Sequence, residues 1–347
     1  MNEIVTETVE STKTAPGIAN RQTREEKPAL RARRRGLVGY LARFGVPIFT
    51  VLLTILFSLL NPDIFPTLPN AQVVAASNSL ALVLALGALV PLVAGEFDLS
   101  MGFTLELSAV VSAVLLGQEG MSVPVVLLIV LFTGAAIGLL NGLLITRIGI
   151  SSFIATLGVG SLAAAASIYL TGGAILIEGI PRSFVAFGQG NTYGIPNMVM
   201  IGLVTLTAFW IVLENMPFGR KLLAVGLSRK ASELVGISAK SMITVSLVIS
   251  GTVSSLCGFL ALSRIGAASS GIGTSYLLPA LAACFLGATT VRVGRFNTLG
   301  TAFAVLLVAI GLNGLQLYGV PGWAEPAFNG GVLLIAVGAS SLAAKRR

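Results

Sequence analysis

Two carboxylates lie close together between apolar stretches of the chain. Glu96 and Asp98 belong to a glycine-bounded segment, residues 95–102, with the order Gly-Glu-Phe-Asp-Leu-Ser-Met-Gly. In a membrane protein such acidic groups commonly mark a solute or ion pathway, and irregular backbone is tolerated where it borders water. Alternatively, both side chains cap the helix that follows, because acidic groups stabilise a helix N-terminus.

A third carboxylate, Glu106, lies deeper in the next apolar stretch. If the turn after Asp98 is helical, Asp98, Gly102 and Glu106 share one face at i, i+4, i+8 spacing. A charge in the hydrocarbon region is costly and is retained for a purpose. At Glu106 the purpose is either a pathway or the packing of one helix against another.

Uncharged amides in the apolar stretches form a second set of candidates. Asn313 and Gln316 share a helix face at i, i+3 spacing, and Asn141 lies in an earlier stretch. Such amides either form hydrogen bonds between helices or together line a weakly polar route for an uncharged, hydroxylated solute. We therefore predict a translocation pathway that contains Asp98, Glu106, Asn141, Asn313 and Gln316.

Several chemistries are excluded by residues that the chain lacks. Histidine is absent, which removes His-dependent triads and imidazole metal sites. Cys257 and Cys284 lie in apolar runs and are interpreted as small core residues. No stretch has the glycine, four residues, Gly-Lys-Ser/Thr order of a phosphate-binding loop. We expect no catalytic residues, metal or cofactor, and a non-enzymatic chain.

The composition indicates a protein that lies in a lipid bilayer rather than in water. Only 10% of the 347 residues are charged and 55% are hydrophobic, with a mean hydropathy of +0.92. A typical soluble domain has about 25% charged residues, so this chain lacks the polar surface that water requires. The net charge of +8 comes from a basic tail and short loops, and we do not interpret it as a nucleic-acid signal.

Apolar runs of membrane-spanning length recur along the chain. They predict an all-α integral membrane protein with about ten transmembrane helices. The predicted organisation is a disordered basic tail (1–36) followed by a transmembrane domain (37–347) with its longest internal loop at 214–240. The ten predicted spans are 44–60, 71–95, 102–117, 122–146, 150–171, 195–213, 241–262, 276–290, 297–318 and 322–344.

The basic residues agree with one orientation of these spans. With the arginine-rich tail in the cytoplasm, ten crossings return the C-terminus to the same side, as the positive-inside rule favours. Arg182 and Arg264 are the basic exceptions in outside loops. The other internal basic residues then lie inside: Arg147, Arg220, Lys221, Arg229, Lys230, Lys240, Arg292 and Arg295.

The loop 214–240 carries signals of local structure. Ser228 is a suitable N-cap for a short amphipathic helix, and Gly236 is a suitable residue to end it. By composition alone, a solvated charged loop is the alternative interpretation.

Several motifs occur in an order typical of one family. They are the segment 95–102, Asn141-Gly142, residues 153–158, the loop 218–237, and Gly300-Thr301 with Asn313-Gly314. Together these motifs resemble the permease subunits of bacterial ribose/xylose-type ABC importers, which are related to branched-chain amino-acid permeases. The resemblance extends over residues 40–343 and implies the ABC importer permease fold.

In that family the loop that corresponds to 218–237 holds a coupling helix, which docks on a separate ATPase. The sequence has Ser-Arg-Lys-Ala at 228–231 where Asn-Glu-Ala-Ala is common, so we expect an acidic partner in the ATPase groove. A second departure is the lack of acidic residues after Tyr276. The coupling residues implied by position are Arg229, Lys230, Ala231, Ser232, Glu233 and Gly236.

The resemblance also implies partners and a solute class. The partners are a cytoplasmic ATP-binding-cassette ATPase, an extracytoplasmic solute-binding protein, and a second permease chain in a homodimer or heterodimer. The solute is a monosaccharide or similar neutral molecule, imported across the bacterial cytoplasmic (inner) membrane. The alternatives are a branched-chain amino-acid permease and an ion-coupled secondary transporter.

The predicted orientation places both chain ends in the cytoplasm. In a variant without Cys257 and Cys284, we expect a membrane-impermeant thiol reagent added to intact cells to leave Asn20→Cys and Arg346→Cys unlabelled. Labelling after the cells are opened is the positive control. Labelling of either site in intact cells would contradict this topology.

Overall fold

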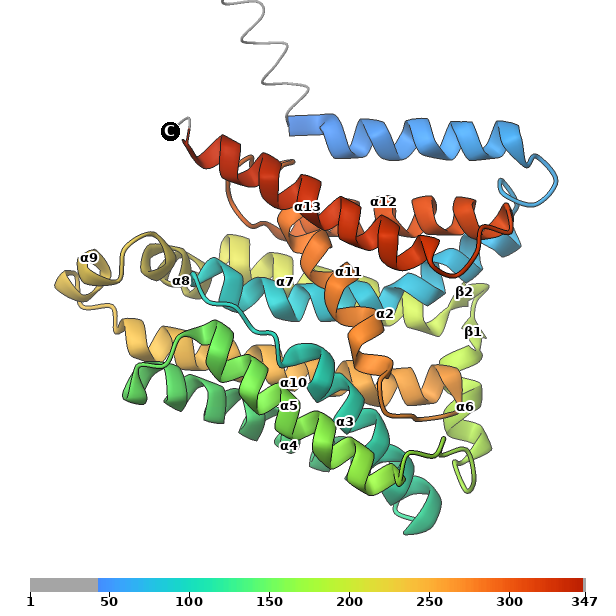
Figure 1. Ribbon diagram of the computed structural model, residues 1–347, viewed down its shortest axis with the longest axis horizontal. Helices are drawn as coiled ribbons and strands as arrows, with labels where there is room; N and C mark the ends of the chain where they lie inside the picture. The colour runs from blue at the N-terminus through green and yellow to red at the C-terminus, as the bar shows by residue number, and fades with distance from the viewer. Residues whose placement is uncertain (1–42, 346–347) are drawn as a thin grey trace, which may run out of the picture. The chain divides into compact units, whose positions relative to one another are not determined.

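The structure is a computed structural model that describes residues 43–345 (Figure 1). The predicted tail of residues 1–36 lies outside the described residues, as do residues 37–42 and the last two. Helices make up most of the described chain. Its one short hairpin pairs β1 (Asn191–Thr192) with β2 (Ile195–Pro196) in antiparallel fashion.

The helices follow the order of the predicted spans. A helix over Arg43–Leu60 precedes α2. Then come α2 (Leu68–Val93), α3 (Met101–Ala113), η2 (Val114–Gln118), α4 (Val123–Leu143), η3 (Leu144–Ile148), α5 (Ser152–Thr171), α6 (Arg182–Gln189) and α7 (Asn197–Trp210). The remainder are η4 (Ile211–Asn215), α8 (Pro217–Leu227), α9 (Arg229–Leu234), α10 (Ala239–Ile265), α11 (Ile272–Gly287), α12 (Thr298–Leu317) and α13 (Ala324–Lys345).

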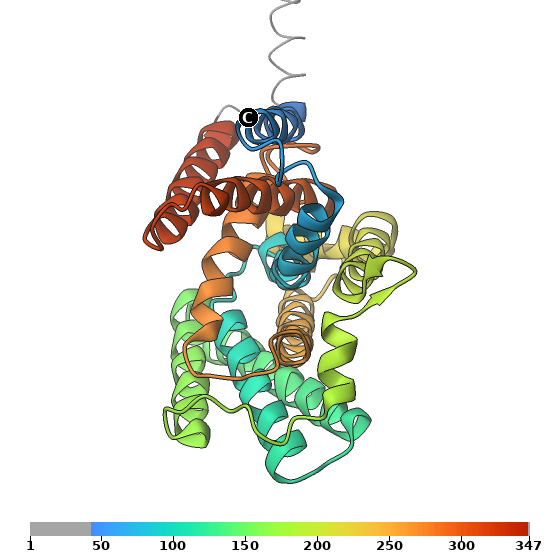
Figure 2. The same ribbon diagram turned by 90° about the vertical axis from the view of Figure 1, so that its right-hand side faces the viewer.

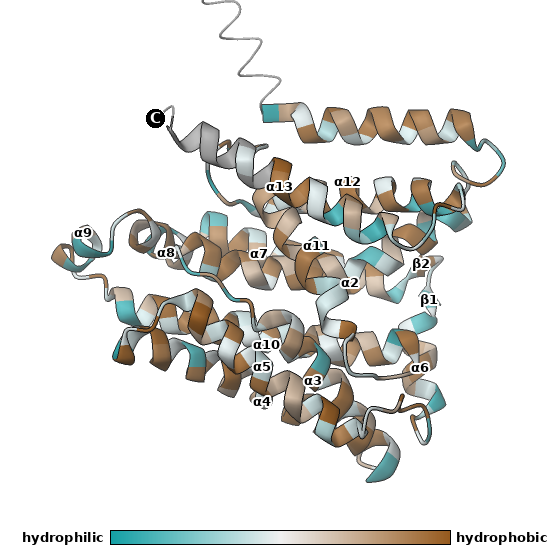
Figure 3. Ribbon diagram, viewed as in Figure 1, coloured by the Kyte–Doolittle hydropathy of each residue, from teal (hydrophilic) through white to brown (hydrophobic). Residues whose placement is uncertain are grey.

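Every predicted span coincides with a helix, and the all-α membrane fold is confirmed. Within the described residues, eight helices are long and apolar enough to cross a membrane. Figure 3 shows hydrophobic residues along these helices and hydrophilic ones gathered at sites such as α9. The predicted span 276–290 corresponds to α11, which has 16 residues and contains Pro279. It extends only about 24 Å at 1.5 Å per residue, less than the hydrocarbon thickness.

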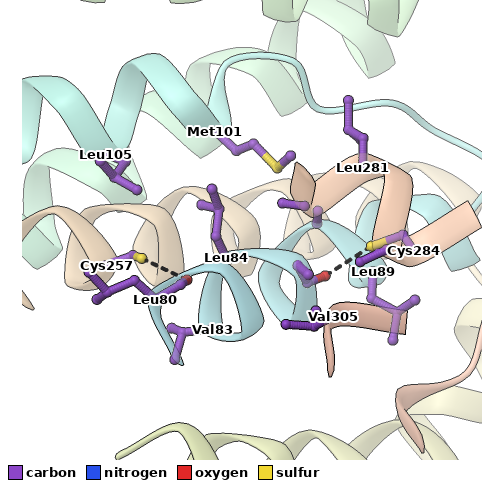
Figure 4. Packing of buried hydrophobic residues seen from close by; sticks show 14 of the residues in the cluster. Leu80, Val83, Leu84, Leu89, Met101, Leu105, Cys257, Leu281, Cys284 and Val305 are labelled. Carbon is purple, nitrogen blue, oxygen red and sulfur yellow. Dashed lines mark hydrogen bonds between the residues drawn. The ribbon is translucent and has the colours of Figure 1, made fainter. Parts of the chain in front are cut away.

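The core forms around α2. Figure 2 shows α12 and α13 on one side of α2, with α3, α4 and α5 on the other. Leu84 and Leu89 of α2 are fully buried and pack with Met101, Leu281 and Val305 from three other helices (Figure 4). The second half of α2, residues 80–93, is surrounded by other helices and is apolar on all sides, as a buried helix should be.

The two cysteines lie in this core, as the sequence predicts. Both are fully buried and unpaired. The Cys257 Sγ–H donates to the Leu80 carbonyl and the Cys284 Sγ–H to the Ala85 carbonyl, each over 3.2 Å (Figure 4). They act as small core residues that tie α10 and α11 to α2.

Glycines bring α4 and α10 into backbone contact. Gly134, Gly138 and Gly142 recur every fourth residue along α4 and therefore lie on one face. A methyl group on Gly138 would collide with the Leu247 carbonyl of α10, and one on Gly134 with the Gly251 carbonyl. Small residues of this kind allow close helix packing in lipid, where no hydrophobic force draws helices together.

The structure gathers the predicted inside loops at one end of the bundle. Residues of η3, α8 and the start of α10 share one apolar cluster, which includes Ile145, Leu222 and Ala239. The hairpin β1–β2 and α6 lie at the opposite end from α8 and α9 (Figure 1). The predicted grouping of loops is thus consistent with the fold, and which end faces the cytoplasm stays a prediction.

The glycine contact between α4 and α10 predicts a stability effect. We expect Gly138→Val to lower the free energy of unfolding by about 1–3 kcal/mol, because the added side chain overpacks the interface. Gly158→Val on α5 is the matched control, since no atom lies within 4 Å of the added carbon there. Unfolding of both variants in bicelles measures the difference, and equal stabilities would contradict the role of this contact.

Candidate functional site

The chain leaves helical geometry between α2 and α3. The helix α2 ends two residues after Pro91, Gly95 adopts φ +81°, and residues 96–99 have no regular secondary structure. The free backbone N–H groups of this break find hydroxyl partners on α5. Phe97 N–H donates to Ser152 Oγ over 3.2 Å, and Leu99 N–H donates to Thr156 Oγ1 over 3.0 Å. These bonds satisfy backbone groups that lipid would leave unpaired.

Asp98 lies at the centre of a buried polar network. Its side chain is 2% exposed. One carboxylate oxygen accepts bonds from Ser100 N–H (3.0 Å) and Ser100 Oγ–H (2.6 Å), and the other accepts from Ser250 Oγ–H of α10 (2.6 Å). Asn141 of α4 donates to Ser100 Oγ over 2.9 Å. The network therefore joins two predicted pathway residues, Asp98 and Asn141, and links three helices.

The expected helical register of Asp98 is wrong. Because α3 begins at Met101, Asp98 precedes the helix and does not share a face with Glu106. Gly102 and Glu106 do share one, since both lie against Gly273 of α11. The bond from Ser100 N–H to Asp98 does place a carboxylate at the entry to α3, as the capping alternative proposed.

Glu106 contacts the start of another helix. Its side chain is 2% exposed, and one oxygen accepts the Gly273 N–H in the first turn of α11 over 3.2 Å. A carboxylate there is stabilised by the partial positive charge of the helix N-terminus. This contact favours the helix-packing alternative for Glu106.

Glu96 has a different partner from Asp98. Its carboxylate forms an ion pair with Arg229 of α9, so it bonds across the structure rather than capping α3. The Glu96 side chain is 4% exposed and that of Arg229 is 55% exposed. The sequence led us to expect that Arg229 pairs with an acidic residue of the ATPase. In the structure Arg229 instead pairs with Glu96 of this chain.

Asn313 and Gln316 lie at a cavity, away from Asp98. The Asn313 and Asn70 amides bond each other in both directions, at 3.1 and 3.2 Å, and so tie α12 to α2. Asn313 and Gln316 line one cavity of about 390 Å³, here called the polar cavity. Its other polar lining residues are Ser77, Asn78, Ser275, Tyr276 and Glu325.

A second cavity of about 550 Å³ adjoins the other side of Asn313. It lies between the helix Arg43–Leu60, α2, α7 and α12, and its lining is mainly apolar. Asp98, Glu106 and Asn141 line neither of these cavities. The five predicted pathway residues therefore form a buried network, a helix contact and a cavity wall rather than one site.

The loop 214–240 contains two short helices, α8 and α9. As predicted, Ser228 caps α9: its Oγ accepts the Ala231 N–H over 3.3 Å. Gly236 ends this segment with φ +81°, and Ile237 N–H returns to the Ser232 carbonyl over 2.9 Å. Ser232 is buried, whereas Lys230, Ala231 and Glu233 are exposed.

Sequence reasoning missed several partners of the predicted residues. Ser250 belongs to a row of serines, Ser246, Ser250 and Ser254, at i, i+4 spacing on α10, and all three are buried. That spacing is a signal of a polar helix face toward other helices. Asn70 gave no such signal, because only the fold brings it to Asn313.

The apolar helical bundle, with eight described helices long enough to cross a membrane, is that of a multi-pass membrane protein. Residues 71–337 match the family described as branched-chain amino acid transport system / permease component. The chain belongs to this family. The prediction of a membrane permease subunit of a transport system is therefore confirmed.

Several relatives share one name. The autoinducer 2 import system permease protein LsrD of Salmonella typhimurium (strain LT2) is 31% identical over 296 residues, which cover 84% of this chain and 88% of that protein. LsrD of Escherichia coli (strain SMS-3-5) is 31% identical over 297 residues, which cover 84% and 89%. No solved structure matches the chain.

The Asp98 network predicts a difference between neighbouring serines. We expect Ser250→Ala to destabilise the protein by about 1.5–3 kcal/mol, because it removes a hydrogen bond to a buried charged group. Ser254→Ala is the matched control, since the Ser254 hydroxyl bonds only its own helix at the Ser250 carbonyl (2.7 Å). Unfolding in bicelles compares the two variants. Equal losses would show that Asp98 does not depend on Ser250.

Proposed function

We propose that this chain is the membrane subunit of an ATP-binding-cassette importer that carries a monosaccharide or a similar neutral solute. Membership of the permease family supports a transport subunit, and relatives named for an autoinducer 2 import system support the direction of import. The chain works with a separate cytoplasmic ATPase, an external solute-binding protein and a second permease chain. It spans the cytoplasmic membrane with both ends in the cytoplasm.

Exposed apolar residues at and beside α9 are the observation that supports binding of an ATPase. Leu227, Leu234 and Val235 are 71%, 88% and 73% exposed in a loop that also presents charged side chains. Apolar residues gathered on such a surface favour contact with another protein. This short capped helix, at the position of the family's coupling helix, is suited to dock in a groove of the ATPase through residues 230–236, while Arg229 pairs with Glu96 of the same chain.

The polar cavity is the proposed part of the pathway. Its volume of about 390 Å³ lies in the range of small-molecule sites. The Asn313 and Gln316 amides and the Asn78 amide offer hydrogen bonds to hydroxyl groups without a fixed charge. Asp98, Asn141 and Glu106 hold the helices around the pathway.

An ion-coupled secondary transporter is less well supported. Such a transporter needs carboxylates free to take up and release an ion. Asp98 instead accepts three protein hydrogen bonds, and Glu106 accepts one from the start of α11. A branched-chain amino acid stays the second candidate solute, because the family description names it.

ATP hydrolysis by the reconstituted complex tests the proposal. The permease, purified with its ATPase and binding protein, is supplied in turn with D-ribose, D-xylose, D-galactose and L-leucine. We expect a sugar-loaded binding protein to stimulate hydrolysis. Stimulation by leucine alone would favour the amino-acid alternative, and no stimulated hydrolysis with any partner would contradict an ABC importer.

Gly236 provides a test of the loop. Its φ of +81° is inaccessible to proline, whose ring fixes φ near −65°. We expect Gly236→Pro to leave membrane insertion intact but to reduce transport per ATP hydrolysed, because the end of α9 is displaced. Gly322→Pro, in the loop before α13, is a control outside 214–240. Normal coupling in Gly236→Pro would remove this loop from the mechanism.

The pathway residues should affect rate more than selection. We expect Asn313→Ala to lower transport a few-fold without changing which solute is carried, because affinity is supplied by the external protein. Solute competition assays compare the variant with the parent protein. A changed solute preference would show that selection takes place inside the membrane.

A further inference from the structure

Two interruptions of helical geometry lie at the same end of the bundle as α8 and α9. The first break, residues 94–100, separates α2 from α3, and the second break, residues 288–297, separates α11 from α12. Each contains a glycine with positive φ, Gly95 at +81° and Gly294 at +78°. Each break leads into a helix named above, α3 with Glu106 and α12 with Asn313.

The loop 214–240 is bonded to the first break through Arg229. The Arg229 guanidinium pairs with Glu96, whose side chain is almost fully buried. The backbone also meets here, because a side chain on Gly226 at the end of α8 would collide with the Val93 carbonyl. The first break and the loop are therefore in direct contact at a charged pair and at a glycine.

The loop is bonded to the second break by an ion pair in which the loop side supplies the acid and the break supplies the base. Glu214, in η4 where the loop begins, lies 3.0 Å from the Arg292 guanidinium, with side chains 8% and 56% exposed. The other Glu214 oxygen accepts the Thr298 hydroxyl (2.5 Å) and the Thr298 N–H (3.2 Å). Glu214 thereby caps the first turn of α12 as well as pairing with the break.

Three phenylalanines connect the two breaks with each other. Phe97 of the first break stacks on Phe285 of α11, with ring centroids 6.1 Å apart. Phe285 contacts Phe296 of the second break edge-on, with centroids 5.4 Å apart. A displacement of one break is therefore opposed by packing against the other.

We propose that Glu96–Arg229 and Glu214–Arg292 are positioning pairs that transmit movement of the loop 214–240 to α3 and α12. This inference rests on the proposed function, in which an ATPase moves that loop. In each pair the acid is buried and the base is half-exposed. Breaking either pair leaves a desolvated carboxylate without its counter-ion and weakens the contact through which the loop and the break move together.

The test measures access to the polar cavity, near the start of α11 and away from the two breaks. Ser275 lines the polar cavity and is exposed, so a Ser275→Cys thiol reports access to that cavity. Because the native cysteines are fully buried, we expect no modification of Cys257 or Cys284. The permease–ATPase complex in nanodiscs is treated with ATP and vanadate, and the modification rate of the Ser275→Cys thiol is measured with a charged methanethiosulfonate.

We expect ATP to change this rate in the parent complex, and Arg229→Gln or Arg292→Gln to reduce the change by about fivefold or more, the lower end of typical coupling between sites. Arg229→Lys should keep the response. Arg147→Gln, an exposed arginine in η3, is the matched control and should also keep it. ATPase bound to the permease is measured by co-purification.

Each outcome distinguishes the inference from the proposed function. No ATP response in the parent complex would contradict the proposed function and, with it, the inference. A parent-like response in Arg229→Gln and Arg292→Gln would overturn the inference alone. Loss of the ATPase from Arg229→Gln on co-purification would also overturn it, because Arg229 would then be a docking contact rather than a positioning residue.

Discussion

A carboxylate buried among membrane helices must be hydrogen-bonded by the protein, and Asp98 places this requirement on several elements at once. Ser100 at the entry to α3 and Ser250 of α10 bond the carboxylate, and Asn141 of α4 bonds Ser100. These contacts require α4 and α10 to approach closely, which glycine at positions such as 138 permits. The buried charge and the glycine packing therefore depend on each other.

The helix break that carries Asp98 also explains how the two ends of the bundle are related. Its Glu96 faces the loop 214–240, whereas its Asp98 faces the membrane helices. The polar cavity with Asn313 and Gln316 lies farther along α12, beyond the second break. The loop 214–240, where we propose that the ATPase docks, is thus connected to the cavity by α12, which starts at the second break and lines the cavity.

Much of the fold was predictable because lipid imposes strong constraints on sequence. Apolar runs located the helices, and Ser228 with Gly236 defined α9, since caps and span lengths are local properties. The helical register of Asp98 was not predictable, because Ser250 and the hydroxyls of α5 stabilise a non-helical backbone there. The partners of Arg229 and Asn313 lie 133 and 243 residues away in the chain, and only tertiary structure brings them together.

The energy source of transport distinguishes an ATP-driven importer from an ion-coupled transporter. Proteoliposomes that contain the complete complex, with ATP held constant on the ATPase side, are supplied with labelled D-ribose, D-xylose, D-galactose or L-leucine and the binding protein. For an ATP-driven importer we expect uptake to continue when a protonophore collapses the proton gradient and to stop when vanadate blocks ATP hydrolysis. Uptake that persists with vanadate and disappears with the protonophore would contradict this expectation.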